Sequence, residues 1–326
     1  MNNEYNNYNN NEEYTPRHAN NYYQNNMNTD LIIDNSLNYS NVKKQDTLNT
    51  IDNTKKKTKK KNIWILVILF SIFLAIIVFC LIKIFVWGKN NKDTSKVIED
   101  INNTVNVTLR EDDSNTEIVN DTKEEVTSDY WYYIKFPLID VDITKLKEKN
   151  ADTVGWINVN NININYPFVQ GKDNSYYLSH SFDKKYNEAG WVFLDYRNSK
   201  DLNNKNTILY AHSRLDKTMF GSLSKVLKSS WYNNKDNHII RLSTETENTL
   251  WQIFSVYKIP EESYYITTNF NSNEEYTKFL NTIKQRSIHN FNTNLDINDK
   301  ILTLSTCYSD TERTVVHAKL IKRSPK

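Results

Sequence analysis

Short runs rich in β-branched and aromatic residues fill the chain from about residue 130 onward. Turn-rich connections separate eight such runs, at residues 154–159, 162–169, 191–195, 207–211, 238–242, 250–259, 300–306 and 314–321. Runs of this length and composition, bounded by turn residues, predict β-strands. Eight strands in one region of this size predict a mainly β domain, built as a single barrel or sandwich.

Two stretches in the same region have the spacing of a helix. Within residues 272–287, apolar residues recur at positions i, i+3, i+4 and i+7, namely Tyr276, Phe279, Leu280 and Ile283. This spacing predicts an amphipathic helix with Ser272 or Asn273 as its N-cap. A helix inserted so late is expected to pack over one face of the barrel. A second, short helix is expected at residues 139–149 from the spacing of its apolar residues.

An uninterrupted apolar run lies nearer the N-terminus. Residues 63–82 contain no charged residue, and Trp64 and Trp87 stand at the two ends of the apolar segment. Twenty helical residues span about 30 Å, the thickness of the hydrocarbon core of a bilayer. The lysine-rich residues 55–61 precede the run and predict a cytoplasmic N-terminus. Residues 63–87 are therefore expected to form one transmembrane helix, with the C-terminal domain outside the cell.

Composition divides the rest of the chain. Residues 1–62 are expected to be a disordered, Asn-rich cytoplasmic tail ending in the lysine cluster, because they carry too few apolar residues to form a core. Residues 88–129 are polar and increasingly acidic, and are expected to form an extracytoplasmic stalk. Residues 130–326 are expected to form the folded domain. The formal net charge is only +2, which gives no indication of nucleic-acid binding.

The chain contains two cysteines, Cys80 and Cys307. Cys80 lies in the expected membrane helix, so Cys307 has no intramolecular disulfide partner in the domain outside. Cys307 ends a strand-like run, and the period of a strand places Ser305 on the same face. If the next run pairs as a hairpin, Arg313 becomes a cross-strand neighbour of Cys307, where a guanidinium lowers a thiol pKa or stabilises an oxyanion. The alternative is a buried structural cysteine that precedes a turn.

A thiol nucleophile normally works with a proton-transfer partner. Among the histidines that follow the membrane helix, His212 comes directly after an apolar strand, where a loop can present it. His180, His238 and His289 are expected to be ordinary surface residues, and His317 lies too far along its strand to partner Cys307 directly.

Other kinds of site find little support in the sequence. One cysteine and scattered histidines lack the close spacing of a zinc site. The five glycines form no phosphate-binding loop, and no G-x-S-x-G motif is present. No metal and no cofactor are therefore expected.

Residues 303–307, with the sequence Thr-Leu-Ser-Thr-Cys, resemble the signature of class B sortases when taken together with Arg313 and with Val-Val-His-Ala-Lys-Leu at 315–320. Further stretches resemble blocks of that family in the same order, at residues 154–157, 166–170, 176–178, 190–197, 209–212 and 219–221. The resemblance covers roughly residues 130–326. One departure is Ala211, where the family usually has glycine; alanine is the smallest replacement, so we expect the site to be undisturbed.

The resemblance implies an extracytoplasmic cysteine transpeptidase on an eight-stranded sortase-type β-barrel, with an N-terminal helix and a helix inserted before the cysteine strand. It implies that Cys307 is the nucleophile and His212 the general acid and base. Arg313 is expected to stabilise the substrate or the oxyanion, and Ser305 to contact the substrate.

The family also implies partners. Its members cleave a short sorting motif near the C-terminus of a secreted protein, after threonine, and pass the acyl group to an amine, commonly on the peptidoglycan of the Gram-positive cell wall. The expected partners are therefore secreted proteins with a sorting motif, a peptidoglycan precursor or other amine acceptor, and the membrane through residues 63–87, without nucleic acid.

Two other functions remain open at this point. A cysteine hydrolase on the same scaffold would pass the acyl group to water, and product analysis with and without an added amine separates it from a transpeptidase. A non-catalytic wall- or peptide-binding module would leave Cys307 unreactive toward a thiol-directed probe at neutral pH.

Overall fold

The computed structural model describes residues 46–119, 129–260, 262–307 and 312–326, and it divides the chain into two units, residues 1–71 and 72–326. The helix α1 (Asp46–Thr104) contains the apolar segment. Within the described ranges it is the one helix long and apolar enough to cross a membrane, and its apolar window is fully exposed. This finding is consistent with a single membrane span.

The N-terminal end of α1 begins earlier than the sequence indicated. Residues 46–62, expected to close a disordered tail, are helical. Lysine is a good helix former, and extending an existing helix costs far less than nucleating one. The remainder of the expected tail, residues 1–45, lies outside the described residues.

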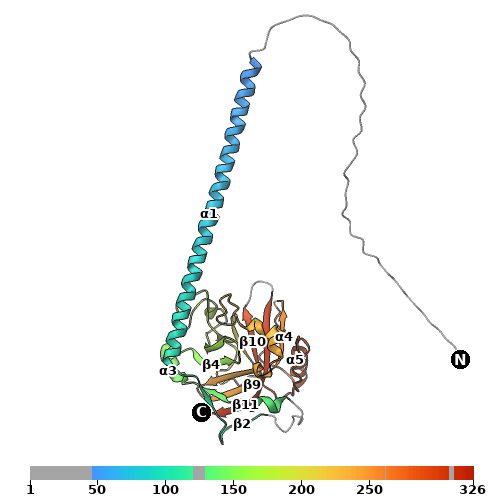
Figure 1. The fold of residues 1–326 in the computed structure, drawn as a ribbon. Coiled ribbons are helices and arrows are strands. Elements are labelled where there is room, and N and C mark those ends of the chain that lie inside the picture. Colours follow the sequence, from blue (N-terminus) through green and yellow to red (C-terminus); the bar gives the residue numbers. More distant parts are fainter. Residues whose placement is uncertain (1–45, 120–128, 261, 308–311) are drawn as a thin grey trace, which may run out of the picture. The chain divides into compact units, whose positions relative to one another are not determined.

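The second unit is built around a set of strands. Their bounds are β4 (Thr153–Val159), β5 (Ile164–Val169), β6 (Phe193–Leu194), β7 (Asn206–His212), β8 (Ile239–Thr244), β9 (Glu247–Ile259), β10 (Ile301–Cys307) and β11 (Arg313–Pro325). Over the described residues these eight strands pair in the order β10–β7–β6–β5–β4–β8–β9–β11, and a further pairing of β10 with β11 closes them into a barrel (Figure 1). The predicted mainly β, eight-stranded barrel is confirmed, with one strand at each predicted run.

Hydrophobic burial holds the barrel together. Trp156, Trp191 and Trp251 are almost completely buried in the main core cluster, and so are Leu302 and Leu304 of β10. Burying an aromatic or leucine side chain contributes about 2 kcal/mol each. The two leucines therefore occupy the barrel core, which leaves the other face of β10 to Thr303 and Ser305, as the period-2 pattern predicted.

Shorter elements precede and connect the barrel strands. They are β1 (Thr108–Arg110), β2 (Glu117–Ile118), α2 (Tyr130–Tyr133), β3 (Leu138–Asp140), α3 (Ile143–Lys149), η2 (Tyr176–Leu178), η3 (Leu223–Leu227), α4 (Ser229–Tyr232), η4 (Lys235–Asn237) and η5 (Tyr264–Ile266), where η is a 3₁₀ helix. The helix expected at 139–149 starts only at Ile143, because β3 pairs with β1 and the side chain of Asp142 then accepts from the amide of Thr144 as an N-cap.

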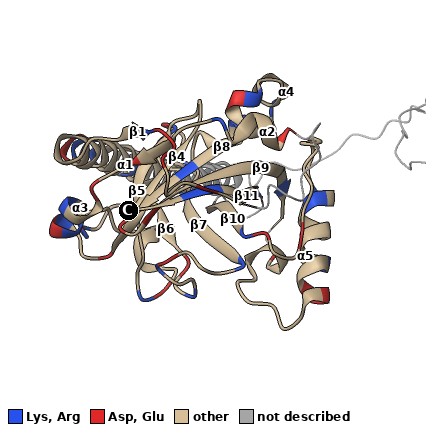
Figure 2. Cartoon of the chain, turned by 90° about the horizontal axis from the view of Figure 1, so that it is seen from below, with Lys and Arg blue, Asp and Glu red and all other residues tan. Residues whose placement is uncertain are grey.

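The inserted helix is α5 (Asn273–Gln285), close to the predicted range, and Ser272 is its N-cap. Its four buried residues, Tyr276, Phe279, Leu280 and Ile283, form a second core cluster with residues of β9, β10 and β11. The helix therefore covers an outer face of the barrel. In Figure 2 the charged residues lie mainly on α3, α5 and the loops, while most of the strand length carries none.

The segment expected to be a stalk is attached to the barrel over much of its length. Ile101 and Val105, at the end of α1, are buried in the main core cluster, and β2 pairs with β11. The amide of Asn187 donates to the carbonyl of Asn90, at 3.2 Å, and to Thr94 Oγ1, at 3.1 Å. Residues 120–128 lie outside the described residues, so the boundaries expected for the stalk stay a prediction.

Candidate active site

Three neighbouring strands meet at one end of the barrel: β7 and β10 end there, and β11 begins there. β7 and β10 run parallel, and their register pairs His212 with Cys307. β10 and β11 run antiparallel with Ser305 opposite Val315, and the same register continued by two residues brings Arg313 level with Cys307. Adjacent strands lie about 4.8 Å apart. The hairpin expected from the sequence is therefore confirmed, and the residues expected to act together lie side by side.

The imidazole of His212 is half-buried and is oriented by a carbonyl group. Its Nε2 lies 2.7 Å from the backbone oxygen of Leu178, in η2. A carbonyl oxygen only accepts, so Nε2 carries the hydrogen and the basic nitrogen of the neutral ring is Nδ1. The carbonyl of His212 accepts from the amide of Phe220 at 3.0 Å. Leu178 therefore sets the tautomer and the direction of the ring.

Gly190 makes room for this contact. Its φ of 60° lies in the left-handed region, where glycine avoids the strain that a side chain brings. A Cβ at this position would lie 2.5 Å from Tyr177 O, 2.8 Å from Leu178 O and 3.1 Å from the Cδ2 atom of His212. Glycine is thus required both by the backbone conformation and by the approach of η2 to the histidine.

We expect Gly190→Ala to lower kcat/KM for the acyl transfer that the family resemblance implies, by about 10- to 100-fold. The new methyl group displaces the Leu178 carbonyl and misaligns His212. The strained backbone should also lower the free energy of unfolding by about 1–2 kcal/mol. Steady-state kinetics and urea denaturation measure the two effects. Gly88→Ala is the matched control, since a Cβ at Gly88 meets no atom within 4 Å. Unchanged kinetics for Gly190→Ala would show that the Leu178 contact is dispensable.

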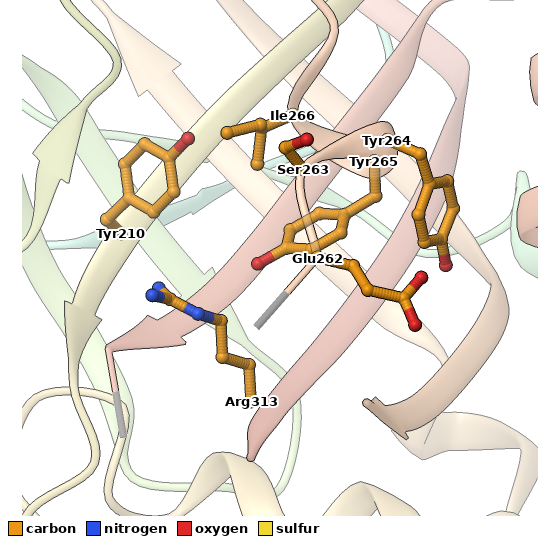
Figure 3. Close-up of a pocket in the computed structure, with 7 residues that line it drawn as sticks. All are labelled: Tyr210, Glu262, Ser263, Tyr264, Tyr265, Ile266 and Arg313. Atoms are coloured by element: carbon orange, nitrogen blue, oxygen red, sulfur yellow. The ribbon is translucent and has the colours of Figure 1, made fainter. Parts of the chain in front are cut away.

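A cleft of about 490 Å³ opens beside Arg313. The residues that line it are Tyr210, Glu262, Ser263, Tyr264, Tyr265, Ile266 and Arg313. In Figure 3 the guanidinium of Arg313 extends toward Tyr210, and the hydroxyl of Tyr265 points to the same space. Aromatic walls with a few placed polar groups are typical of a ligand site. The cleft is therefore a candidate ligand site.

An ion pair between the buried Asp195 and the exposed Arg197 fixes two of the cleft residues, Tyr210 and Ile266. The hydroxyl of Tyr210 donates to Asp195 Oδ2 at 3.0 Å. Asp195 also accepts from Nε and Nη2 of Arg197, at 2.9 and 2.7 Å, and Nη2 donates in addition to the carbonyl of Ile266 at 2.8 Å. Burial alone would raise the pKa of Asp195, but its hydrogen bonds and the charge of Arg197 hold that pKa below the usual value. The carboxylate therefore stays ionised and anchors both walls.

Ser305 lies behind the cleft wall. Its side chain is fully buried, and its Oγ lies 3.0 Å from the hydroxyl oxygen of Tyr265. Tyr265 is the residue of this pair that lines the cleft. Contact between Ser305 and a substrate stays a prediction, and the structure offers Tyr265 as the group through which Ser305 would act.

The other described histidines make structural contacts. The rings of His180 and Tyr176 stack with centroids 4.0 Å apart, and His289 stacks on Tyr232 at 4.4 Å. His238, expected on the surface, is buried: its Nε2–H donates to the carbonyl of Tyr232 at 2.8 Å. These contacts account for the rings without a catalytic role.

Two buried histidines predict a loss of stability in acid. Burial lowers the pKa of His238 to about 4 and that of His317 to about 3, against about 6.5 in the unfolded chain. Between those values the unfolded state binds more protons, so the folded state loses stability as the pH falls below 6.5. We expect about 2 kcal/mol of lost unfolding free energy per histidine from pH 6.5 to 5. Urea denaturation at the two pH values measures this loss of unfolding free energy, and the loss should be about half as large in His238→Gln. An equal unfolding free energy at pH 6.5 and pH 5 would contradict the lowered pKa values of the two histidines.

Within the described part of the chain, no group of three or more His, Cys, Asp or Glu residues could hold a metal ion. The arrangement that is present can supply a nucleophile position, a base and a cation.

Several residues of the site had no role assigned from the sequence. Leu178, Gly190, Asp195, Arg197 and Tyr210 all lie in stretches that the family resemblance picked out. One signal was available: Tyr210 lies two residues before His212 on the same strand, so the period of a strand places both on one face. The contacts of the others depend on pairings between distant segments.

Comparison with known proteins places this geometry in a family. A family model described as a sortase domain matches residues 157–321. The chain is 40% identical over 183 residues to sortase B of Staphylococcus aureus, covering 55% of this chain and 74% of the relative. It is 32% identical over 227 residues to sortase B of Listeria monocytogenes, covering 67% and 90%.

A solved structure agrees with these relatives. A complex of Staphylococcus aureus sortase B with its substrate is 39% identical and superposes with a TM-score of 0.52, over 55% of this chain and 84% of that one. The barrel is shared and the signature residues around Cys307 are present. The chain therefore belongs to the sortase family and, within it, to the class B sortases, which are cysteine transpeptidases.

Proposed function

We propose that this enzyme cleaves a C-terminal sorting motif of secreted proteins after threonine, holds the acyl group as a thioester on Cys307, and transfers it to an amine of the cell wall. The observation that carries the proposal is the register of three adjacent strands. It brings His212, Cys307 and Arg313 to one edge of the barrel, beside a cleft of about 490 Å³.

The chemistry divides into two steps. In the first, the thiol of Cys307 passes its proton to His212 and the sulfur attacks the carbonyl carbon of the threonine. The C–N bond then breaks, and His212 gives that proton to the leaving amine. In the second, an incoming amine attacks the thioester, the C–S bond breaks, and His212 takes the proton of the amine and returns it to the sulfur of Cys307. Arg313 stabilises the oxyanion formed in both steps or holds the peptide carbonyl.

The cleft supplies the acyl-donor site. Tyr264 and Tyr265 offer flat apolar surface with a polar tip, a combination suited to holding an extended peptide. Staphylococcus aureus sortase B has been solved with its substrate, and we propose that the same class of substrate, a sorting peptide, binds here. Ser305 would act on it through Tyr265.

The location follows from α1. We propose that residues 63–87 span the cell membrane, that the lysine-rich side faces the cytoplasm, and that residues 130–326 act outside the cell. At that place secreted proteins and peptidoglycan precursors meet. The residues before 63 would then form the cytoplasmic tail and residues 88–129 the segment that joins the membrane to the barrel.

The test uses the full chain in detergent micelles. It is mixed with a library of threonine-containing sorting peptides, and intact mass is followed with and without a triglycine or a diaminopimelate peptide. We expect an acyl adduct that the amine discharges into a new amide and that Cys307→Ala does not form. An adduct cleared only by water would favour a hydrolase. An unreactive Cys307 without any adduct would favour a peptide-binding module.

A further inference from the structure

A chain of hydrogen bonds begins and ends on one wall of the cleft. Its members are Tyr264, Tyr257, His317, Thr303 and Asn206, and we call it the His317 chain. Five of the seven cleft residues belong to the segment 262–266, and the His317 chain contacts that segment at Tyr264 and again at the carbonyl of Tyr265. Between these two contacts it passes through four strands of the barrel, β9, β11, β10 and β7.

The direction of every hydrogen bond follows from the Asn206 end. Its Nδ2 donates to the carbonyls of Tyr265 and Thr267, at 3.1 and 2.9 Å, which fixes Oδ1 as an acceptor. Thr303 therefore donates its hydrogen to Oδ1, at 2.7 Å. The oxygen of Thr303 is then the acceptor for Nδ1–H of His317, at 2.9 Å.

The other half of the chain follows in the same way. Burial keeps the imidazole of His317 neutral by lowering its pKa to about 3. With its hydrogen on Nδ1, Nε2 accepts from the hydroxyl of Tyr257 at 2.7 Å. The oxygen of Tyr257 in turn accepts from the hydroxyl of Tyr264 at 2.8 Å. Each shared hydrogen has one donor and one acceptor, which requires a neutral histidine at the centre.

The His317 chain connects the cleft wall to the strand that ends in Cys307. Thr303 lies on β10, four residues before Cys307, and Asn206 begins β7, the strand that ends in His212. Thr303 and His317 are fully buried, so no water competes for these groups. The position of the wall is thus fixed relative to the strands that carry the thiol and its base.

We propose that His317 is a positioning residue for the acyl donor: through Tyr257 on one side and Thr303 on the other, it holds the wall 262–266 at the distance from β10 that a bound peptide needs. This inference rests on the proposed function, in which the cleft binds the acyl donor. It assigns a role to a histidine that does not reach the reacting atoms.

Thr303 offers a matched pair of substitutions. Thr303→Val keeps the shape but removes the hydroxyl that joins His317 to Asn206, whereas Thr303→Ser keeps the hydroxyl. In the full chain in micelles, we expect Thr303→Val to raise KM for the acyl-donor peptide about tenfold with kcat within about threefold of the unchanged enzyme. Thr303→Ser should stay within about twofold in both. The alkylation rate of Cys307 by iodoacetamide, which needs no peptide, should be equal in all three.

Hydrogen–deuterium exchange separates this inference from the proposed function, because it needs no substrate. Thr303→Val should speed exchange of the amides of 262–267 about tenfold or more, while Thr303→Ser should not. Equal exchange for both variants would overturn the inference, as would a loss in kcat with KM unchanged. Failure of every peptide to react with the unchanged enzyme would instead overturn the proposed function.

A second variant covers the case in which Thr303→Val does not fold. Tyr264→Phe removes only the first hydroxyl of the chain, from a half-buried side chain, and should raise KM about threefold. Its control is Tyr132→Phe, which loses a hydroxyl bonded to Asp236 and outside the cleft. Equal KM for Tyr264→Phe and Tyr132→Phe would also count against the inference.

Discussion

Replacing His212 by alanine is expected to lower kcat/KM for acyl transfer about 10³-fold, because the same imidazole protonates the leaving amine and deprotonates the incoming one. The register of β7 and β10 pairs His212 with Cys307, and the Leu178 carbonyl holds its hydrogen on Nε2. A ring so oriented keeps its basic nitrogen, Nδ1, in a fixed direction. Imidazole is the side-chain group best suited to general acid and base catalysis.

The measurement is the rate of amide formation from a sorting peptide and an amine, with Cys307→Ala as the floor. Imidazole added to His212→Ala should restore part of the rate, since a small base can enter the space that the ring leaves. His289→Ala is the matched control, because His289 stacks on Tyr232, and it should stay within about threefold of the unchanged enzyme. A His212→Ala variant that keeps more than about a tenth of the rate would remove His212 from the mechanism.

The predictable part of the fold is its local part. Each of the eight barrel strands could be predicted from the composition of its own residues. The spacing of apolar residues within 272–287 predicts α5 because all its buried residues lie on one face of a single helix. The short strands β1, β2 and β3 could not be read in this way. They contain two or three residues each, too few to show a period, and their pairing partners are distant in the sequence.

The candidate site also has a part that local sequence predicts and a part that depends on pairings between distant segments. Arg313 follows Cys307 by six positions, so a hairpin alone suffices to bring them level. The parallel pairing that brings His212 to Cys307 joins segments almost a hundred residues apart, and only the apolar run before His212 hinted at it. The contacts of Leu178, Asp195 and Tyr265 depend on such distant pairings entirely.

The hydrogen bonds of His317 could not be predicted from the sequence. From the sequence it is a histidine on a strand, too far from Cys307 to act on it. The structure places it, fully buried, between Thr303 and Tyr257, and this makes the signature threonine Thr303 part of the support for the cleft wall. The hydroxyl of Thr303 thus satisfies a buried acceptor on Asn206 and a buried donor on His317.

The second large effect is expected at Arg313. Replacement by alanine should lower kcat/KM about 10²- to 10³-fold. The strand register brings Arg313 level with Cys307, and its guanidinium extends toward Tyr210 in the cleft (Figure 3), where it can stabilise a developing oxyanion. Arg313→Lys should still lose about 10- to 100-fold, since an ammonium group keeps the charge but not the planar, two-pronged donor geometry.

The division of the loss between kcat and KM tells the two roles of Arg313 apart. If Arg313 stabilises the oxyanion, its loss lowers kcat and leaves KM for the peptide nearly unchanged. If Arg313 binds a peptide carbonyl in the ground state, its loss raises KM. Arg323→Ala is the matched control: Arg323 lies on the same strand, pairs with Glu247, and should change kcat/KM less than about threefold. If Arg313→Ala behaved like Arg323→Ala, the guanidinium would have no part in the reaction, and the stabilisation of the oxyanion would have to come from the backbone amides of the barrel edge.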